Sequence, residues 1–536
     1  MFPIYYYPKG KKLQYFFVNS TVSCANLLKF FCECAIINCC IKNNPSDRIR
    51  MQVNEVENYD VIIVGGGVAG LNTALHLDSR LRVLLLCKRE STLCNSSLAQ
   101  GGMVSVYDEA NDSCALHIED TMIAGRGENN REAVTVLSRE SHLAADELIA
   151  LGVDFDRDEQ GNYHLTLEGG HSRHRILHHK DSTGREIVDK MLAAVRQREN
   201  VELLDNALVC DIKQIAGGYS LNVLQGGEHR TLSARFCVLA TGGLGRLYQY
   251  TTNSAIATGD GIAMAYQMGA RIRNLSYIQF HPTAFHNDKR ECFLISEAVR
   301  GSGAYLLNCH GKRFMDRYDE RLELAPRDVV SQAIMKEQEA TGSKDFYLDI
   351  SHKDSDYLRG RFPMIYTNLL ERGFDLTKEP IPIYPCQHYL MGGIDVDLYS
   401  RTTLDGLYAV GECSHTGVHG RNRLASNSLL EGIVFGRRAA LDINERAGQS
   451  GEELRPYPFK PDVYTADIPK GTRTEIRSIM QRSHFVLPNR QLAEEGFIRI
   501  NDIRFLLEHG QFRQNADYVE ARSLATCAYL ILREIM

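Results

Sequence analysis

The chain has 536 residues, of which 44% are hydrophobic and 24% are charged, and its formal net charge is −6. This length allows roughly three domains of 100–200 residues, each large enough to bury a core. The acidic balance provides no broad cationic field, so we predict no nucleic-acid partner, and attraction of an anionic ligand must come from local arginines.

Fifteen cysteines are scattered along the chain, odd in number and without the paired CxxC spacing of a zinc or iron–sulfur site. We therefore predict no metal. Free thiols at this density are typical of a reducing compartment, so we expect the protein in the cytoplasm.

The first fifty residues differ in kind from the rest, being aromatic, apolar and rich in cysteine. Their most apolar stretch, residues 22–41, is interrupted by Lys29 and Glu33. A membrane span needs about 20 apolar residues, and no small-residue cleavage site follows the stretch. We expect residues 1–58 to be an extension outside the fold, with Met51 just before the first strand. A membrane-associated arm is the alternative.

A dinucleotide-binding turn opens the next segment. Residues 60–64 are an apolar strand, residues 82–86 supply a second strand at βαβ distance, and between them lies the turn Gly65-Gly66-Gly67-Val68-Ala69-Gly70. The first glycine allows the tight turn, the third lets a pyrophosphate approach, and the last lets the helix pack on the sheet. The acidic residue that binds the ribose of NAD is missing after Leu86, which disfavours NAD.

Two later segments extend this pattern. Residues 236–243 again run a buried strand into a small-residue turn, as FAD-binding folds often do. Residues 418–431 carry His419, Arg421, Arg423 and a row of hydroxyl and amide side chains at the start of an apolar helical run. Cations and helix N–H groups aimed at one spot predict an anionic substrate beside a cofactor. The alternative is a capped helix with solvated arginines.

Further motifs occur in one fixed order, at residues 98–102, 254–264, 279–283, 297–301, 324–328 and 423–431. With the glycine turn they make the chain resemble the succinate dehydrogenase and fumarate reductase flavoprotein family, from about Tyr59 to the C-terminal region. Within that family, residues 163–172 and 362–366 resemble the L-aspartate oxidases.

The resemblance implies an α/β FAD-binding Rossmann-like domain with an inserted α+β capping domain and a C-terminal helical domain. The expected ranges are 59–274 with 390–459 for the FAD-binding domain, 275–389 for the capping domain and 460–536 for the helical domain. Apolar spacing independently predicts helices at 328–340, 473–485, 491–507 and 516–532. A cap over the flavin would exclude water and strengthen each charge contact.

Removal of a hydride from a four-carbon diacid calls for cations at both carboxylates and a proton acceptor. By resemblance, the carboxylates are held by His281, Ser296, His388 and Arg423, with Gln279 beside them. Arg327 is the implied proton-exchange group, although guanidinium is a poor base outside a dry site with neighbouring cations. Its alternative is a structural arginine paired with Asp328.

Glu168 is the residue that the resemblance implies for the α-ammonium of aspartate, and its alternative is a solvated loop glutamate. FAD is expected to be non-covalent, because membrane-complex relatives carry the linking histidine where this chain has Asn95. Lys88 would replace the missing acid at the adenosine end. The other implied cofactor contacts are the turn Gly65–Gly70, the segment Asn95, Ser96, Ser97, Leu98, Ala99, Gln100, Gly101 and Gly102, and Asp260, Glu412, Ser428 and Leu429.

The implied activity is FAD-dependent oxidation of L-aspartate to iminosuccinate, with oxygen reduced to hydrogen peroxide or fumarate to succinate, as the first step of NAD biosynthesis from aspartate. Iminosuccinate would pass to quinolinate synthase, and no membrane partner is expected. Two alternatives stay open: a succinate dehydrogenase or fumarate reductase flavoprotein subunit, and a non-catalytic FAD-binding module.

Overall fold

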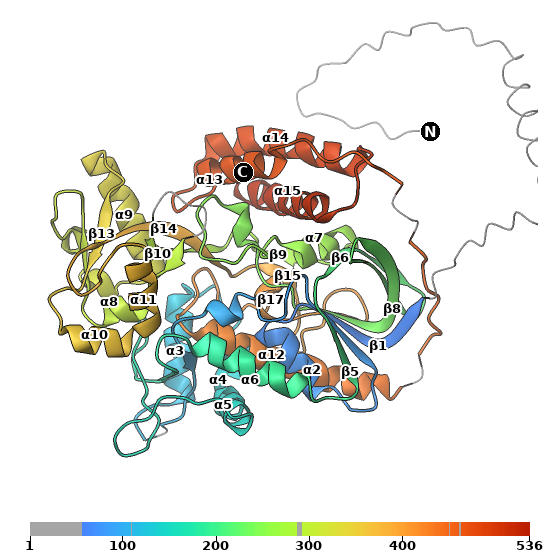
Figure 1. The fold of residues 1–536 in the computed structure, drawn as a ribbon, viewed down its shortest axis with the longest axis horizontal. Helices are drawn as coiled ribbons and strands as arrows, with labels where there is room; N and C mark the ends of the chain where they lie inside the picture. Colours follow the sequence, from blue (N-terminus) through green and yellow to red (C-terminus); the bar gives the residue numbers. More distant parts are fainter. Residues whose placement is uncertain (1–55, 109, 287–291, 450, 460–462) are drawn as a thin grey trace, which may run out of the picture. The chain divides into compact units, whose positions relative to one another are not determined.

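The structure is a computed structural model that describes residues 56–108, 110–286, 292–449, 451–459 and 463–536 (Figure 1). Nearly all of the predicted extension, residues 1–58, lies outside these ranges. The described part from Val56 onward belongs to one compact unit.

A seven-stranded sheet forms the centre, in the order β5-β2-β1-β8-β7-β6 with β16 beside β8. The strands β1, β2, β5, β8 and β16 pair in parallel, whereas β6 and β7 continue from β8 as an antiparallel meander. Their bounds are β1 Glu57–Val64, β2 Val83–Leu86, β5 Val201–Leu204, β6 Ala207–Ile215, β7 Gly218–Gln225, β8 Glu228–Leu239 and β16 Leu407–Ala409.

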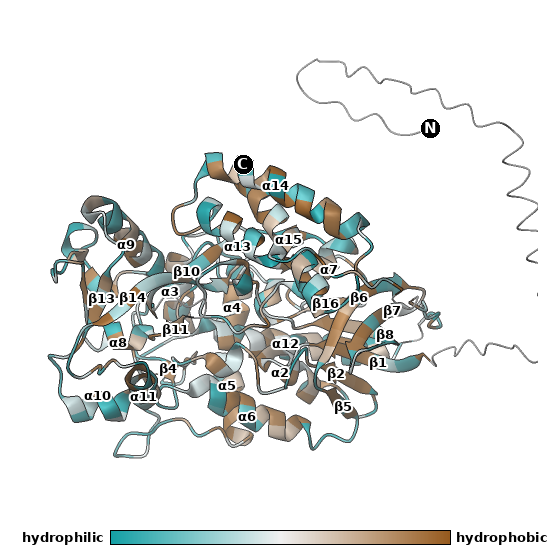
Figure 2. Ribbon diagram, turned by 45° about the horizontal axis from the view of Figure 1, so that its top comes forward, coloured by the Kyte–Doolittle hydropathy of each residue, from teal (hydrophilic) through white to brown (hydrophobic). Residues whose placement is uncertain are grey.

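Helices cover both faces of this sheet, which is why residues 61–64 of β1 and all of β2 are continuous apolar runs. Val61 and Ile63 pack into one core with α2 (Val68–His76), α6 (Thr183–Val195) and α12 (Asn427–Ala447). Ile62 and Val64 pack into the other core with α7 (Asp260–Gln267) and α15 (Ala516–Ile535). Figure 2 shows hydrophobic residues gathered on the central strands.

A second sheet of five strands has the antiparallel order β11-β10-β14-β13-β12. Its strands are β10 Ile278–Phe285, β11 Phe293–Leu294, β12 Tyr305–Leu307, β13 Phe346–Asp349 and β14 Ile381–Leu390. It has its own apolar core. The accompanying helices are α8 Glu297–Gly301, α9 Arg327–Thr341, α10 Ser355–Arg361 and α11 Pro363–Glu371. The sheet falls inside the expected capping segment 275–389, whose bounds stay a prediction.

Three C-terminal helices, α13 Thr472–Ser483, α14 Arg490–His509 and α15, form a bundle. In this bundle α15 packs against α7 and β6, while α13 and α14 pack against α15 (Figure 1). Smaller elements complete the described fold: α3 Cys114–Ala124, α4 Arg131–Arg139, α5 Ser141–Ala150, β3 Met103–Val104, β4 Ile176–Leu177, β9 Ile272–Arg273, β15 Gly393–Asp395 and β17 Ser414–His415. No helix in the described ranges has the length and apolar character to cross a membrane.

Candidate active site

A cavity of about 600 Å³ lies at the carboxyl ends of β1, β2 and β8, where doubly wound sheets bind their ligands. One end is lined by the glycine turn and residues 86–91, and the other by side chains from β10, β14 and the approach to α12. The cavity is therefore long enough to bring a cofactor site and a substrate site together.

The glycine turn adopts the expected geometry. Gly65 has φ +120°, and a Cβ there would lie 2.1 Å from the Ala240 carbonyl oxygen. Gly65, Gly66, Gly67, Val68 and Ala69 line the cavity. Gly70 does not, because it packs against the backbone of Gly65 behind the turn. The N-terminus of α2 thus opens at the cavity, as pyrophosphate binding requires.

The ammonium of Lys88 lines the cavity but is fully engaged by protein groups. Its Nζ lies 2.8 Å from a carboxylate oxygen of Asp260 and 2.8 Å from one of Glu520, and it donates to Thr258 Oγ1 at 2.8 Å. Burial opposes its charge, yet the two carboxylates outweigh burial and raise the Lys88 pKa. Its proposed role at the adenosine end stays a prediction. Glu520, on α15, was not among the residues expected from the sequence.

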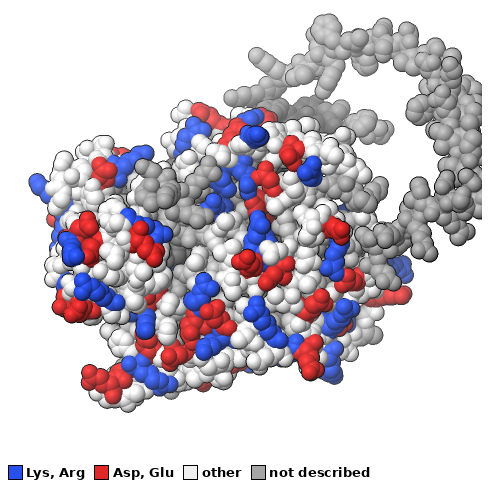
Figure 3. All heavy atoms as spheres, viewed as in Figure 1, with Lys and Arg blue, Asp and Glu red and all other residues white. Residues whose placement is uncertain are grey.

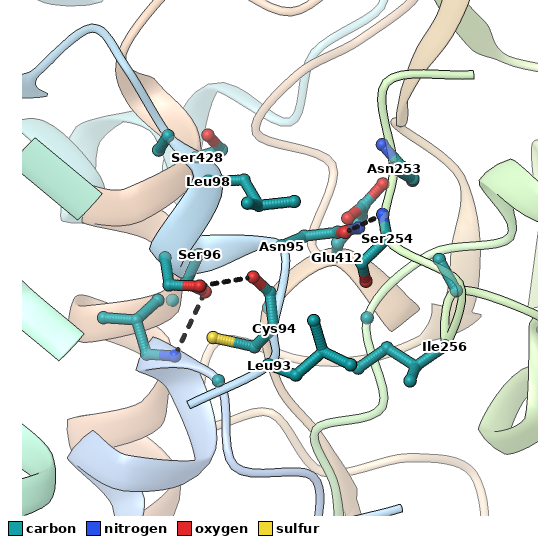
Figure 4. A pocket seen from close by; sticks show the side chains of 18 of the residues that line it. Leu93, Cys94, Asn95, Ser96, Leu98, Asn253, Ser254, Ile256, Glu412 and Ser428 are labelled. Atoms are coloured by element: carbon teal, nitrogen blue, oxygen red, sulfur yellow. Dashed lines mark hydrogen bonds between the residues drawn. The ribbon is translucent and has the colours of Figure 1, made fainter. Parts of the chain in front are cut away.

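The segment Asn95–Gly102 lines the cavity along its whole length. Asn95 Oδ1 accepts from the Ser254 backbone N–H at 2.9 Å, and Figure 4 shows this contact across the cavity. Gln100 joins the segment to β11 and α8, because its Nε2 donates to the Leu294 carbonyl at 2.6 Å and its Oε1 accepts from the Ser296 N–H at 3.1 Å.

The same cavity fits a large polar cofactor. Among the described residues, Ser254 Oγ and Asn253 Oδ1 are buried without a hydrogen-bond partner. Burial raises the pKa of Glu412 to about 7, although the Leu390 N–H donates to it. Buried polar groups normally have hydrogen-bond partners, and the hydroxyls and ring nitrogens of FAD would supply partners for these oxygens. Asp260, Glu412, Ser428 and Leu429 all line the cavity, as expected.

At the substrate end, two buried guanidinium groups share one amide. Gln279 Oε1 accepts from Arg327 Nη1 at 3.1 Å and from Arg423 Nε at 3.3 Å. Burial, and after it the charge of Arg327, lowers the Arg423 pKa to about 10, so Arg423 stays cationic at neutral pH. The Arg423 guanidinium also lies over the Tyr389 ring, 4.1 Å from its centroid. Gln279 does not line the cavity itself and therefore acts behind it.

The two histidines expected at the carboxylates line the cavity, and their role there stays a prediction. Burial, followed by nearby arginines, lowers the pKa of His281 and of His388 well below the usual value, so both are neutral. His281 Nδ1 accepts from the Thr283 N–H at 3.3 Å, which puts the ring proton on Nε2. His281 and His388 line the cavity with Ser296 as neutral polar groups, and the cations are the arginines.

Arg327 is not paired with Asp328, the alternative considered from the sequence. Its Nε donates to Glu297 Oε2 at 2.6 Å, while Asp328 pairs with Arg126. Glu297 also lies 3.3 Å from Arg300 Nη2. Glu297 lines the cavity; it was not among the expected site residues, although it begins the motif 297–301 and stands three residues before Arg300.

Glu168 is buried, with 5% of its surface exposed, so it is not a solvated loop residue. Its Oε2 accepts from Ser426 Oγ at 2.6 Å, directly before α12, and burial raises its pKa. His171, three residues on, contacts the Ala425 carbonyl at 3.0 Å and Arg175 at 3.3 Å. The loop of Glu168 is therefore tied to the residues that precede α12.

Residues 60–429 match the family model described as FAD binding domain. The L-aspartate oxidase of Pseudomonas aeruginosa is 40% identical over 508 residues, 89% of this chain and 93% of that protein. The L-aspartate oxidase of Clostridium perfringens is 47% identical over 72% of this chain and 86% of that protein. A structure of quinol-fumarate reductase with menaquinol molecules has 28% identity and a TM-score of 0.82, covering 89% of this chain and 90% of that one.

The fold and the cavity define an FAD-binding flavoprotein built like the fumarate reductase flavoproteins. The predicted fold class is confirmed, and FAD is the cofactor. With relatives this similar over nearly its whole length, the chain belongs to the L-aspartate oxidase family.

Proposed function

We propose that the chain oxidises L-aspartate to iminosuccinate with bound FAD, reducing oxygen to hydrogen peroxide or fumarate to succinate, as the first step of NAD biosynthesis from aspartate. The names of the relatives support this reaction. The observation that carries it is a buried carboxylate, Glu168, in the same cavity as the cations Arg327 and Arg423. That arrangement matches a dicarboxylate that also bears an ammonium.

The proposed binding mode assigns each polar group of aspartate a partner. Arg423 and Arg327 neutralise the carboxylates, and His281, His388 and Ser296 contact them as neutral groups. Each charge-assisted contact contributes about 1.5–3 kcal/mol. Gln279 positions the two guanidinium groups, because one oxygen accepts from both.

Proton exchange with the substrate is assigned to Arg327. FAD supplies the two-electron acceptor when it is bound. Arg327 Nε donates to Glu297 Oε2 at 2.6 Å, and because a guanidinium is normally protonated, Arg327 can donate a proton in the direction of fumarate reduction. In the direction of oxidation, Glu297 can receive a proton that passes through Arg327.

Glu168 separates this function from that of a succinate dehydrogenase or fumarate reductase subunit, which the structural likeness keeps as the second candidate. Succinate and aspartate present the same two carboxylates, and only aspartate has an α-ammonium. A carboxylate about 4 Å from that ammonium contributes about 4 kcal/mol at an effective dielectric of 20, before desolvation reduces it.

The proposal includes three finer points. FAD is held without a covalent bond, because the Asn95 amide cannot form the histidine linkage; acid precipitation should leave the yellow chromophore in the supernatant. Iminosuccinate passes to quinolinate synthase, and the enzyme works in the cytoplasm. The residue ranges of the FAD-binding, capping and helical domains are proposed as given above.

The test is anaerobic bleaching of the bound flavin. L-Aspartate should bleach it rapidly, and succinate should bleach it slowly or not at all. Rapid bleaching by succinate, with none by aspartate, would instead identify the chain as a succinate dehydrogenase or fumarate reductase subunit.

A further inference from the structure

Two cysteines lie together beside the candidate active site. Cys292 lines the cavity, and Cys386 is fully buried on β14, two residues before His388. Both belong to one small buried cluster with Ala284, and the Cys386 thiol donates to the Tyr384 carbonyl at 3.6 Å. In the sheet register, Cys386 stands opposite His281 on β10.

The approach of the two thiols is held by the surrounding backbone. The Cys292 N–H donates to the Thr251 carbonyl at 3.1 Å. Thr251 in turn donates from its hydroxyl to Gln387 Oε1 at 2.7 Å, next to Cys386. The backbone of Cys292 and the residue after Cys386 are therefore both tied to Thr251.

The pKa values of the two thiols are shifted in opposite directions. The neighbouring Cys386, with a further contribution from His286, lowers the pKa of Cys292, whereas burial raises the pKa of Cys386. Burial alone raises the pKa of Cys237 to about 12. Cys292 is therefore the more acidic thiol of the two, and the thiolate is the form that attacks an oxidant.

We propose that Cys292 and Cys386 are a peroxide-reactive pair that forms a disulfide beside the active site. The proposal rests on the proposed function for its oxidant, because hydrogen peroxide is produced in this cavity when oxygen is the acceptor. Neither residue is assigned a part in the oxidation of aspartate.

The reaction takes two steps. The Cys292 thiolate attacks one peroxide oxygen, the O–O bond breaks, and hydroxide leaves, which gives a sulfenic acid on Cys292. The Cys386 sulfur then attacks the Cys292 sulfur, the S–O bond breaks, and the departing hydroxide takes the Cys386 proton as water. Two thiols lose two electrons in total, and one peroxide becomes two waters.

The disulfide would act on the substrate end of the cavity. It would join β14, behind His281 and His388, to the segment that leads into Ser296. All three residues are proposed substrate contacts, so we expect turnover to fall when the link forms and to return when a dithiol reduces it. The pair would limit the enzyme when peroxide accumulates.

The test exposes the holoenzyme to added hydrogen peroxide without substrate. Mass spectrometry of the digested protein should find the Cys292–Cys386 link, and aspartate turnover should fall about tenfold and recover with dithiothreitol. Cys292→Ser should form no link and keep its own starting activity. In Cys386→Ser, dimedone should trap the sulfenic acid on Cys292.

Cys309→Ser is the matched control, because Cys309 is more exposed than Cys292 and lies away from the cavity lining. This variant should lose activity and form the link as the parent does. Oxidation of Cys309 and Cys114 ahead of an unchanged Cys292 and Cys386 would show that exposure alone decides reactivity, and would overturn the proposal.

A second experiment tests the cysteine pair and the proposed function independently of each other. Turnover of aspartate with oxygen should form the link, whereas anaerobic turnover with fumarate should not. A link that forms with added peroxide but never during oxygen turnover would support the pair and contradict the peroxide-producing reaction.

Discussion

Arg327 and Arg423 are two cations held in one buried cavity, and Gln279 ties them together through a single oxygen. Glu297 compensates the first guanidinium directly. Besides Gln279, Arg423 contacts the Tyr389 ring and the Ser428 hydroxyl, and the carboxylates that favour its charge, Glu412 and Glu168, act on it through space. A bound dianion would relieve the remaining repulsion, which is a physical reason for the site to select dicarboxylates.

Replacing Arg327 by leucine should leave FAD bound and nearly abolish reduction of the flavin by aspartate, because the residue exchanges a proton and does not contact the glycine turn. Stopped-flow absorbance of the flavin measures this directly. Arg126→Leu is the control: it removes the ion pair of the adjacent Asp328 outside the cavity and should leave reduction nearly unchanged. Normal reduction in Arg327→Leu would assign proton exchange to another group.

The pH dependence should differ between the two substrates. Burial raises the pKa of Glu168, so its carboxylate takes up a proton as the pH falls through that raised value and no longer attracts the α-ammonium. We expect kcat/KM for L-aspartate to decrease as the pH falls through the pKa of Glu168, while kcat/KM for fumarate shows no decrease over that range. An identical acid limb for both substrates would show that Glu168 is not the titrating group.

At the scale of the elements, helix α15 reaches from the C-terminal bundle to the wall of the cofactor cavity. Its Glu520 lies 2.8 Å from the ammonium of Lys88, at the end of β2, and also pairs with Arg473 on α13. The C-terminal helices therefore contribute a side chain, Glu520, to the wall of the cofactor cavity as well as apolar residues to the core.

Glu520→Gln should lower the melting temperature of the holoprotein, because the buried Lys88 loses one of its two carboxylates; the cost is about 2 kcal/mol. The control is Asp517→Asn on the same helix, which pairs with Arg473, is about half exposed and does not contact Lys88. Asp517→Asn should lower the free energy of unfolding by less than about 0.5 kcal/mol. Equal melting temperatures for the two variants would mean that the contact with Lys88 contributes nothing.

Local sequence patterns were enough to predict many of these elements. The glycine turn, the strand before it and the helices α9, α13, α14 and α15 lie where they were expected, because each has a local apolar period or turn residue. The contacts of Lys88 with Glu520 and of Cys292 with Cys386 could not be predicted, since they join distant segments. Residues 406–410 are an apolar run typical of a strand, but β16 ends at Ala409, and Gly411, with φ +67°, begins a short 3₁₀ turn.

The chain as a whole has a formal net charge of −6, and on the face shown in Figure 3 basic and acidic side chains are interspersed. We therefore attribute attraction of an anionic substrate to the buried arginines of the cavity. The described fold from Glu57 onward contains every residue that we assign to the site.

A chain that starts at Met51 should keep its flavin content and its turnover, because β1 begins at Glu57 and no assigned cofactor or substrate residue precedes it. The ratio of flavin to protein absorbance and the rate with L-aspartate are the measurements. Loss of either would show that residues 1–50 take part in folding or in the site.

Glu168 is the residue that we expect to make the site select an amino acid, L-aspartate, over succinate. Glu168→Gln keeps the size and hydrogen bonding of the side chain and removes its charge, so the contact with Ser426 can persist while attraction for the ammonium is lost. The measurement is kcat/KM for L-aspartate oxidation and for fumarate reduction in the same preparation. We predict a loss of at least about tenfold with aspartate and a much smaller change with fumarate. Equal loss of both activities, or no loss of either, would contradict the assignment.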